Sequence, residues 1–179
     1  MRTRALVLLV LCFLPLAAVA QHRDPLTDQE TNKLRDTNYE PEKRIKLFLD
    51  FATARLAAVE QLRADPKPAA DRGRRTRDLL QDFGNILDEL SDNLDMYASE
   101  RHDDIRKSLA AVLAATDSFQ LRLHALEPSA GAKPPADAAE YTTALEDALD
   151  SVENTAADAR DLLKTQEEAA AAAKKEKKR

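Results

Sequence analysis

Carboxylate and imidazole side chains recur at helical spacing in the middle of this 179-residue chain. Asp88, Asp92, Asp95 and His102 follow one face of a predicted helix at intervals of four, three and seven residues. Carboxylate oxygens are the usual ligands of hard cations, so these residues are the candidate metal ligands. Side chains on one straight helix diverge, however, and a second element would have to complete the coordination shell. We therefore favour a solvated acidic face, balanced by Arg106, and predict no resident metal.

Residue patterns for catalysis and for cofactors are missing from the sequence. Among the serines, Ser91, Ser99, Ser108 and Ser118 fall on predicted helix bodies, without a strand–turn–helix elbow or a glycine-rich loop to activate them. The chain contains no phosphate-binding or dinucleotide-binding fingerprint. It also has no C-x-x-C-H sequence for covalent haem and no Glu-x-x-His pair for a di-iron bundle. We expect a non-enzymatic protein with no catalytic residue and no cofactor.

The first twenty residues, MRTRALVLLVLCFLPLAAVA, have the three parts of an export signal. Arg2 and Arg4 supply the positive start, an apolar run follows, and residues 18–20 supply the small-x-small ending that a signal peptidase cleaves. The apolar run is shorter than the roughly 20 residues that a transmembrane helix needs, and Pro15 interrupts it. We expect cleavage after Ala20 and a periplasmic or extracellular protein.

Removal of this segment would change the chemistry of the chain. Cys12 is the only cysteine, so the mature protein would have no thiol, no disulfide and no thiolate ligand. Leu11 precedes Cys12 where a lipoprotein signal needs a small residue, which argues against lipidation. The formal net charge would change from −5 to −7 with the loss of Arg2 and Arg4, and this acidity argues against nucleic acid as a partner.

Prolines and glycines divide the remaining chain. Residues 21–40 form an N-terminal segment in which Thr27 and Glu30 have the spacing of a capping box, so we expect a short helix over 28–36. Its apolar residues are only Leu26 and Leu34, which predicts loose docking. The bundle domain spans 41–165. Its predicted helices have similar lengths, which favours an all-α, antiparallel up-and-down bundle of three to four long helices over residues 41–64, 73–98, 103–126 and 137–165.

The sequence permits two ways to connect the predicted helices 73–98 and 103–126. Apolar residues repeat every three or four positions from Leu80 to Tyr97 and again from Ile105 to Leu126. The interval between Tyr97 and Ile105 is eight residues, where an unbroken seam requires seven. Either one long helix spans 74–126 with a shifted seam, or the chain turns near 99–104. Within these seams, Gly84 weakens its helix or permits a close approach, and Thr116 either fixes the register or bonds to its own helix.

Residues 166–179 form an alanine- and lysine-rich charged tail that we expect to be helical. Acidic residues come first and basic residues last, which suits the helix dipole. Without an apolar face the tail should project from the bundle. Its basic end, 174–179, permits contact with an anionic membrane surface, but a solvated helix end is the favoured interpretation.

The signal segment, the cysteine-free helices and the polar stretch SDNLDMYASERHDDIRKSL (91–109) resemble small, secreted, all-helical proteins of high-GC bacteria. This resemblance implies a helical fold and transfers no functional residue. We expect an interaction, scaffold or chaperone-like module whose partner is a protein or a second copy. The first alternative is an amphipathic, apolipoprotein-like binder of lipid or of the cell-envelope surface, and the second is a bundle that binds a divalent metal.

Overall fold

The computed structural model describes residues 24–67, 70–128 and 133–177, and the signal segment 1–20 lies outside these ranges. The described chain contains helices and no strand, which confirms the all-α prediction. No helix in these ranges is both long and apolar enough to cross a membrane. A π-helix over Met96–Glu100 and a 3₁₀-helix over Ala138–Glu140 accompany five α-helices: α1 (Asp28–Asp36), α2 (Pro41–Ala64), α3 (Arg72–Asp95), α4 (Arg106–His124) and α5 (Thr142–Glu176).

Helices α1 and α2 begin where their local sequence signals predict. The Thr27 hydroxyl accepts a hydrogen bond from the Glu30 amide at 3.3 Å, and the Glu30 carboxylate accepts one from the Thr27 amide at 2.8 Å. This reciprocal capping box satisfies two amides that the first turn of a helix leaves free. Pro41 is the first residue of α2, a position where its missing amide costs nothing.

Helix α1 packs sparsely, as its thin apolar face predicts, but two side chains anchor it to the bundle. Leu34 is only 3% exposed and belongs to the main core. The Arg55 guanidinium from α2 also donates to both Glu30 carboxylate oxygens, at 2.6 and 3.0 Å, and to the Pro25 carbonyl oxygen at 2.8 Å. Its Nε lies 3.9 Å from the carboxylate of Asp82 on α3. A half-buried ionic contact thus adds to the docking that the short apolar face of α1 provides.

The chain turns between residues 96 and 105, so 74–126 is not one helix. Helix α3 ends at Asp95 and continues into the π-helix Met96–Glu100, whose wider turn shifts the phase of the side chains. His102 then adopts a left-handed backbone conformation with φ 56°, and α4 begins at Arg106. The eight-residue interval between the two seams marks this change of direction.

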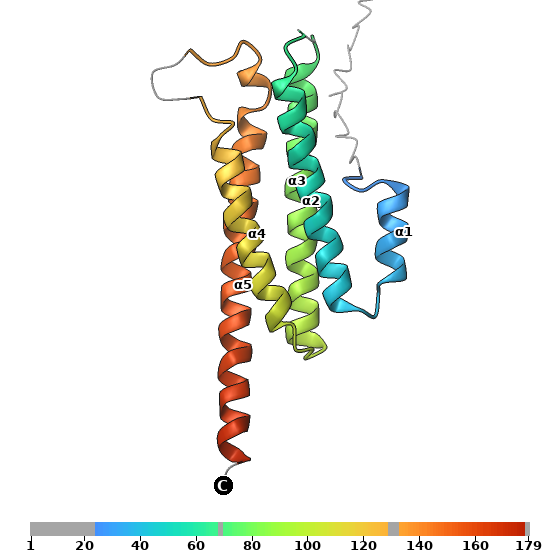
Figure 1. Ribbon diagram of the computed structural model, residues 1–179, viewed down its shortest axis with the longest axis vertical. Helices are drawn as coiled ribbons and strands as arrows, with labels where there is room; N and C mark the ends of the chain where they lie inside the picture. Colours follow the sequence, from blue (N-terminus) through green and yellow to red (C-terminus); the bar gives the residue numbers. More distant parts are fainter. Residues whose placement is uncertain (1–23, 68–69, 129–132, 178–179) are drawn as a thin grey trace, which may run out of the picture.

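The packing of the helices does not follow their order in the sequence. The most extensive contacts join α2 with α3, α3 with α5, and α4 with α5, whereas the consecutive helices α3 and α4 are not among the main packed pairs (Figure 1). A Cβ added at Gly73 would lie 2.9 Å from the Asp137 carbonyl oxygen, and one added at Gly84 would lie 3.3 Å from the Ser151 hydroxyl. The contact partner of the earlier glycine on α3, Gly73, thus comes earlier in the sequence than the partner of the later one, Gly84.

The core lies between these four long helices. Phe83 and Phe119 meet edge to face with ring centroids 5.3 Å apart. Each fully buried large side chain stabilises the fold by about 1.5–3 kcal/mol. Thr116 is buried, and its hydroxyl donates to the Leu113 carbonyl oxygen at 2.9 Å, so it bonds to its own helix. The largest fully buried side chains include Ile45, Phe48, Leu56, Leu80, Phe83, Ile86, Leu87, Leu90, Leu94, Tyr97, Ile105 and Leu109.

Helix α5 is longer than its predicted span of 137–165. It begins only at Thr142, after the 3₁₀-helix, and runs on to Glu176 through most of the predicted tail. Figure 1 shows its C-terminal part extending past the end of the other helices. Residues 171–177 are all exposed, in line with the expectation that the tail projects.

Candidate functional site

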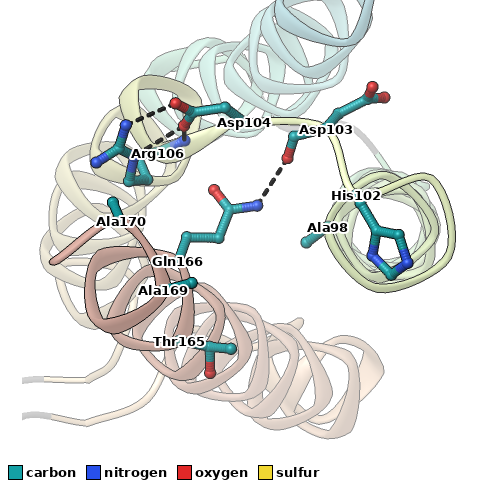
Figure 2. A pocket seen from close by; sticks show the side chains of 9 residues that line it. All are labelled: Ala98, His102, Asp103, Asp104, Arg106, Thr165, Gln166, Ala169 and Ala170. Carbon is teal, nitrogen blue, oxygen red and sulfur yellow. Dashed lines mark hydrogen bonds and ion pairs between the residues drawn. The ribbon is translucent and has the colours of Figure 1, made fainter. Parts of the chain in front are cut away.

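A groove of about 330 Å³ lies between α5 and the turn that joins α3 to α4. We call it the turn groove. Alanine methyl groups line much of it, while His102 and the Asp104–Arg106 pair lie at its two ends (Figure 2). Its lining consists of Ala98, His102, Asp103, Asp104, Arg106, Thr165, Gln166, Ala169 and Ala170.

Gln166 holds the turn against α5. Its Nε2 donates to the Asp103 carbonyl oxygen at 2.7 Å, and its Oε1 accepts from the Ile105 amide at 3.1 Å. Figure 2 shows the side chain reaching across the groove from α5 toward Asp103. One amide side chain therefore satisfies two backbone groups where no helical bond is available to them. This contact fixes the shape of the groove.

An exposed ion pair forms one end of the turn groove. The Arg106 guanidinium donates to both Asp104 carboxylate oxygens, at 2.6 and 2.8 Å. The side-chain hydrogen bonds from Arg106 and a backbone hydrogen bond from the same residue lower the pKa of Asp104 to about 2. Asp104 thus stays ionised at any physiological pH and is unsuited to proton transfer.

Tyr97 lies behind the turn and differs from expectation. The pattern predicts a ring in the core with its hydroxyl in water, yet the residue is fully buried and its hydroxyl has no hydrogen-bond partner among the described residues. The Arg101 guanidinium lies over its ring, 5.0 Å from the centroid. Burial raises the pKa of the Tyr97 phenol, against the opposing charges of Arg44 and Arg101. The phenol is therefore a neutral packing group.

The acidic stripe does not converge. Asp88, Asp92 and Asp95 are exposed on α3, and His102 lies beyond the π-helix on the turn. Among the described residues, no group of three or more His, Cys, Asp or Glu side chains is placed to hold a metal ion. The π-helix and the turn interrupt the single helical face that the spacing predicts.

The remaining histidines lie apart from the turn groove. His124 is exposed at the end of α4, where its Nδ1 is 3.1 Å from a Glu127 carboxylate oxygen. His22 lies outside the described residues. The Thr165 hydroxyl, the only hydroxyl lining the groove, already donates to the Asp161 carbonyl oxygen at 2.9 Å. The groove therefore offers shape, methyl groups and one exposed ion pair.

Sequence reasoning did not identify Gln166 or Gly73. Gln166 falls on the core-facing side of α5, four residues before Ala170, so a polar residue on that seam was a usable signal. Gly73 begins the predicted helix 73–98, but no sequence pattern indicates that an added Cβ there would lie 2.8–2.9 Å from Asp137 and Glu140. Only the fold brings these residues together.

Comparison of the chain with protein-family models, with curated proteins and with solved structures found no match.

Proposed function

We propose that this chain is an exported, non-enzymatic helical-bundle protein that acts by binding another protein, as an interaction, scaffold or chaperone-like module. The observation that carries the proposal is the end of α5, which projects from the bundle next to the turn groove. A projecting helix end beside an alanine-lined hollow is suited to receive a helix from a partner.

The roles of the partly buried charged residues support a binding function rather than a chemical one. Arg55 joins α1 to α2, and Arg63 donates to Asp137 at 2.7 Å near the start of α5. Arg44 donates to the Asn93 side chain on α3 and to the Leu34 carbonyl oxygen of α1. These side chains tie one element to another, and their hydrogen bonds are already made within the bundle.

We further propose that the bundle consists of two antiparallel hairpins, α2–α3 and α4–α5, packed side by side. Arg44 bonds Asn93 and Arg55 faces Asp82, so the α2–α3 contacts run in opposite directions along the chain. Across the hairpins, the order of the Gly84–Ser151 approach and the Ser91–Thr155 hydrogen bond supports a parallel α3–α5 pair. This arrangement replaces a simple ring in which each helix is antiparallel to both neighbours.

Site-specific photo-crosslinking tests the binding proposal. A photoreactive residue at Ala170, in the turn groove, is expected to give a discrete crosslinked product in an extract of the native cell envelope. The same residue at Glu146, exposed near the start of α5, serves as the matched control. Equal labelling at both positions, or no product at Ala170, would count against the proposal.

The export proposal needs a separate measurement, made on the protein recovered from outside the cytoplasm. Mass spectrometry is expected to find an N-terminus at Gln21, because residues 18–20 carry the cleavage pattern. Recovery only from the cytoplasm with Met1 retained would contradict it.

A further inference from the structure

The packing seam of α5 continues past the bundle that covers it. Its members recur at steps of four and three residues and are buried or half-buried at 145, 149, 152, 156, 159 and 163. The same steps continue to Gln166, Ala170, Ala173 and Lys177. Gln166 and Ala170 are half-buried beside the turn, while Ala173 and Lys177 are exposed. The last part of the seam therefore has no helix of the described chain against it.

The charges that flank this uncovered seam are self-complementary. Glu167 follows the seam residue Gln166, and Lys174 follows the seam residue Ala173. Residues seven apart lie on the same side of a helix, so both charges lie along one flank. In an antiparallel pair of identical helices, that flank of one faces the same flank of the other, and each Glu167 would lie opposite a Lys174 of the partner subunit.

We propose that the exposed end of α5 pairs in antiparallel fashion with the same segment of a second copy of this chain. The contact is isologous: a two-fold axis passes near residues 170–173, and the same patch serves both copies. Ala170 packs against Ala173 of the partner subunit, and two reciprocal Glu167–Lys174 pairs close one flank. A parallel pair would place this flank opposite the other flank of the partner, so the reciprocal Glu167–Lys174 pairs could not form.

In the proposed dimer, the C-terminal end of the partner subunit's α5 lies beside the turn groove. In this register, Gln166 lies level with Lys177 of the partner subunit, so the basic tip of each α5 arrives beside the other copy's turn. The exposed Asp104 lies there, paired with Arg106 at 2.6 Å. The alanines of the groove leave room for a helix at an interaxial distance of about 8–10 Å. The inference thus deepens the proposed function and names the partner as the chain itself.

The contact is short, which sets the strength to expect. It uses about three turns of helix from each copy, at the lower end of specific interfaces, which bury about 1,200 Å² or more. We therefore expect a weak, reversible dimer that populates at high micromolar concentrations and dissociates as salt is added, because the flanking pairs are exposed.

Charge exchange at the flank tests the pairing in purified protein. Sedimentation equilibrium should show a monomer–dimer equilibrium for the unmodified chain. Glu167→Lys or Lys174→Glu alone should weaken dimerisation about tenfold, because each creates two like-charge pairs, and the double exchange should restore it. The matched control is Lys175→Glu, which lies one residue away on the face opposite the seam and should have no effect.

Cysteine crosslinking tests the register, in a chain whose Cys12 is replaced by Ser. Mixing Ala170→Cys protein with Ala173→Cys protein should give more disulfide-linked dimer than either protein alone. A strict monomer at millimolar concentration, or a double exchange that fails to restore the dimer, would overturn the inference. A monomer that still crosslinks to a different protein at position 170 in the envelope extract would overturn self-pairing and leave the proposed function standing.

Discussion

Replacing Arg55 by Met should detach α1 and destabilise the whole bundle. The Arg55 and Glu30 side chains are 13% and 14% exposed, and the Asp82 side chain, 3.9 Å from Arg55, is 9% exposed. The substitution keeps the aliphatic packing but removes the cation that faces both carboxylates. Breaking a buried pair by removing one partner costs about 3–5 kcal/mol. We expect about 3 kcal/mol, because Glu30 lies close to the surface.

Urea unfolding followed by far-ultraviolet circular dichroism measures this loss. For a domain of this size each kcal/mol corresponds to about 2–4 °C, so the melting temperature should fall by about 6–12 °C. Glu30→Gln should cost less than Arg55→Met, because the glutamine still accepts a hydrogen bond and Arg55 keeps Asp82. Arg160→Met, at an exposed position on α5, is the control and should change stability by less than about 0.5 kcal/mol.

The Glu30–Arg55 contact should also make the stability of the protein depend on pH in a defined direction. Burial by itself raises the pKa of Glu30, but hydrogen bonds from Arg55 and Thr27 outweigh it and hold the pKa below its ordinary value of 4.5. A carboxyl with a lowered folded pKa stabilises the fold above its unfolded pKa and loses that contribution as pH falls through the folded value. The difference between the unmodified chain and Arg55→Met should therefore shrink below about pH 4.5.

Two results would refute this reasoning. One is a loss for Arg55→Met no larger than that of the control, which would mean that the ionic contact adds nothing beyond apolar packing. The other is unchanged hydrogen exchange at the amides of 31–36 in Arg55→Met. That result would show that α1 is held by Leu34 alone.

Three further predictions concern the turn, a close helix approach and a half-buried carboxyl. Gln166→Ala should cost about 2 kcal/mol in urea unfolding, because it leaves two backbone groups without their partner. Gly73→Ala should lower the melting temperature by overpacking, at a cost of about 1–3 kcal/mol, whereas Gly84→Ala should be near neutral because 3.3 Å to a serine hydroxyl leaves room to adjust and alanine favours the helix. Burial raises the pKa of Glu89, so its charge opposes folding at neutral pH, and Glu89→Gln should stabilise the protein at pH 7 by up to about 1 kcal/mol and less at pH 4.

The helices were predictable where local signals are strong. The capping box placed α1 and Pro41 placed the start of α2, and both helices have the predicted bounds of 28–36 and 41–64. The seam periodicity identified the core faces of α3 and α4. These signals act over a few residues, so one sequence suffices to read them.

The turn groove was not predictable, because it depends on contacts between residues that are distant in sequence. Gln166 bonds groups at Asp103 and Ile105, about sixty residues earlier. The eight-residue interval before Ile105 permitted either a turn or a shifted seam, and the choice depended on how α5 packs. The prediction that His102 shares one helical face with Asp88, Asp92 and Asp95 was wrong, since spacing predicts a common face only while one helix continues.

The placement of α3 and α4 on non-adjacent corners of the bundle has a consequence for how the chain is held in register. In the proposed arrangement, the turn between them links the α2–α3 and α4–α5 hairpins but does not determine how one hairpin packs on the other. That alignment comes from side-chain pairs across the interface, such as Gly84 with Ser151 and Ser91 with Thr155. A backbone break near residues 101–102 would therefore leave two fragments, each with one of the proposed hairpins. Each fragment would keep one member of every side-chain pair that aligns the two hairpins.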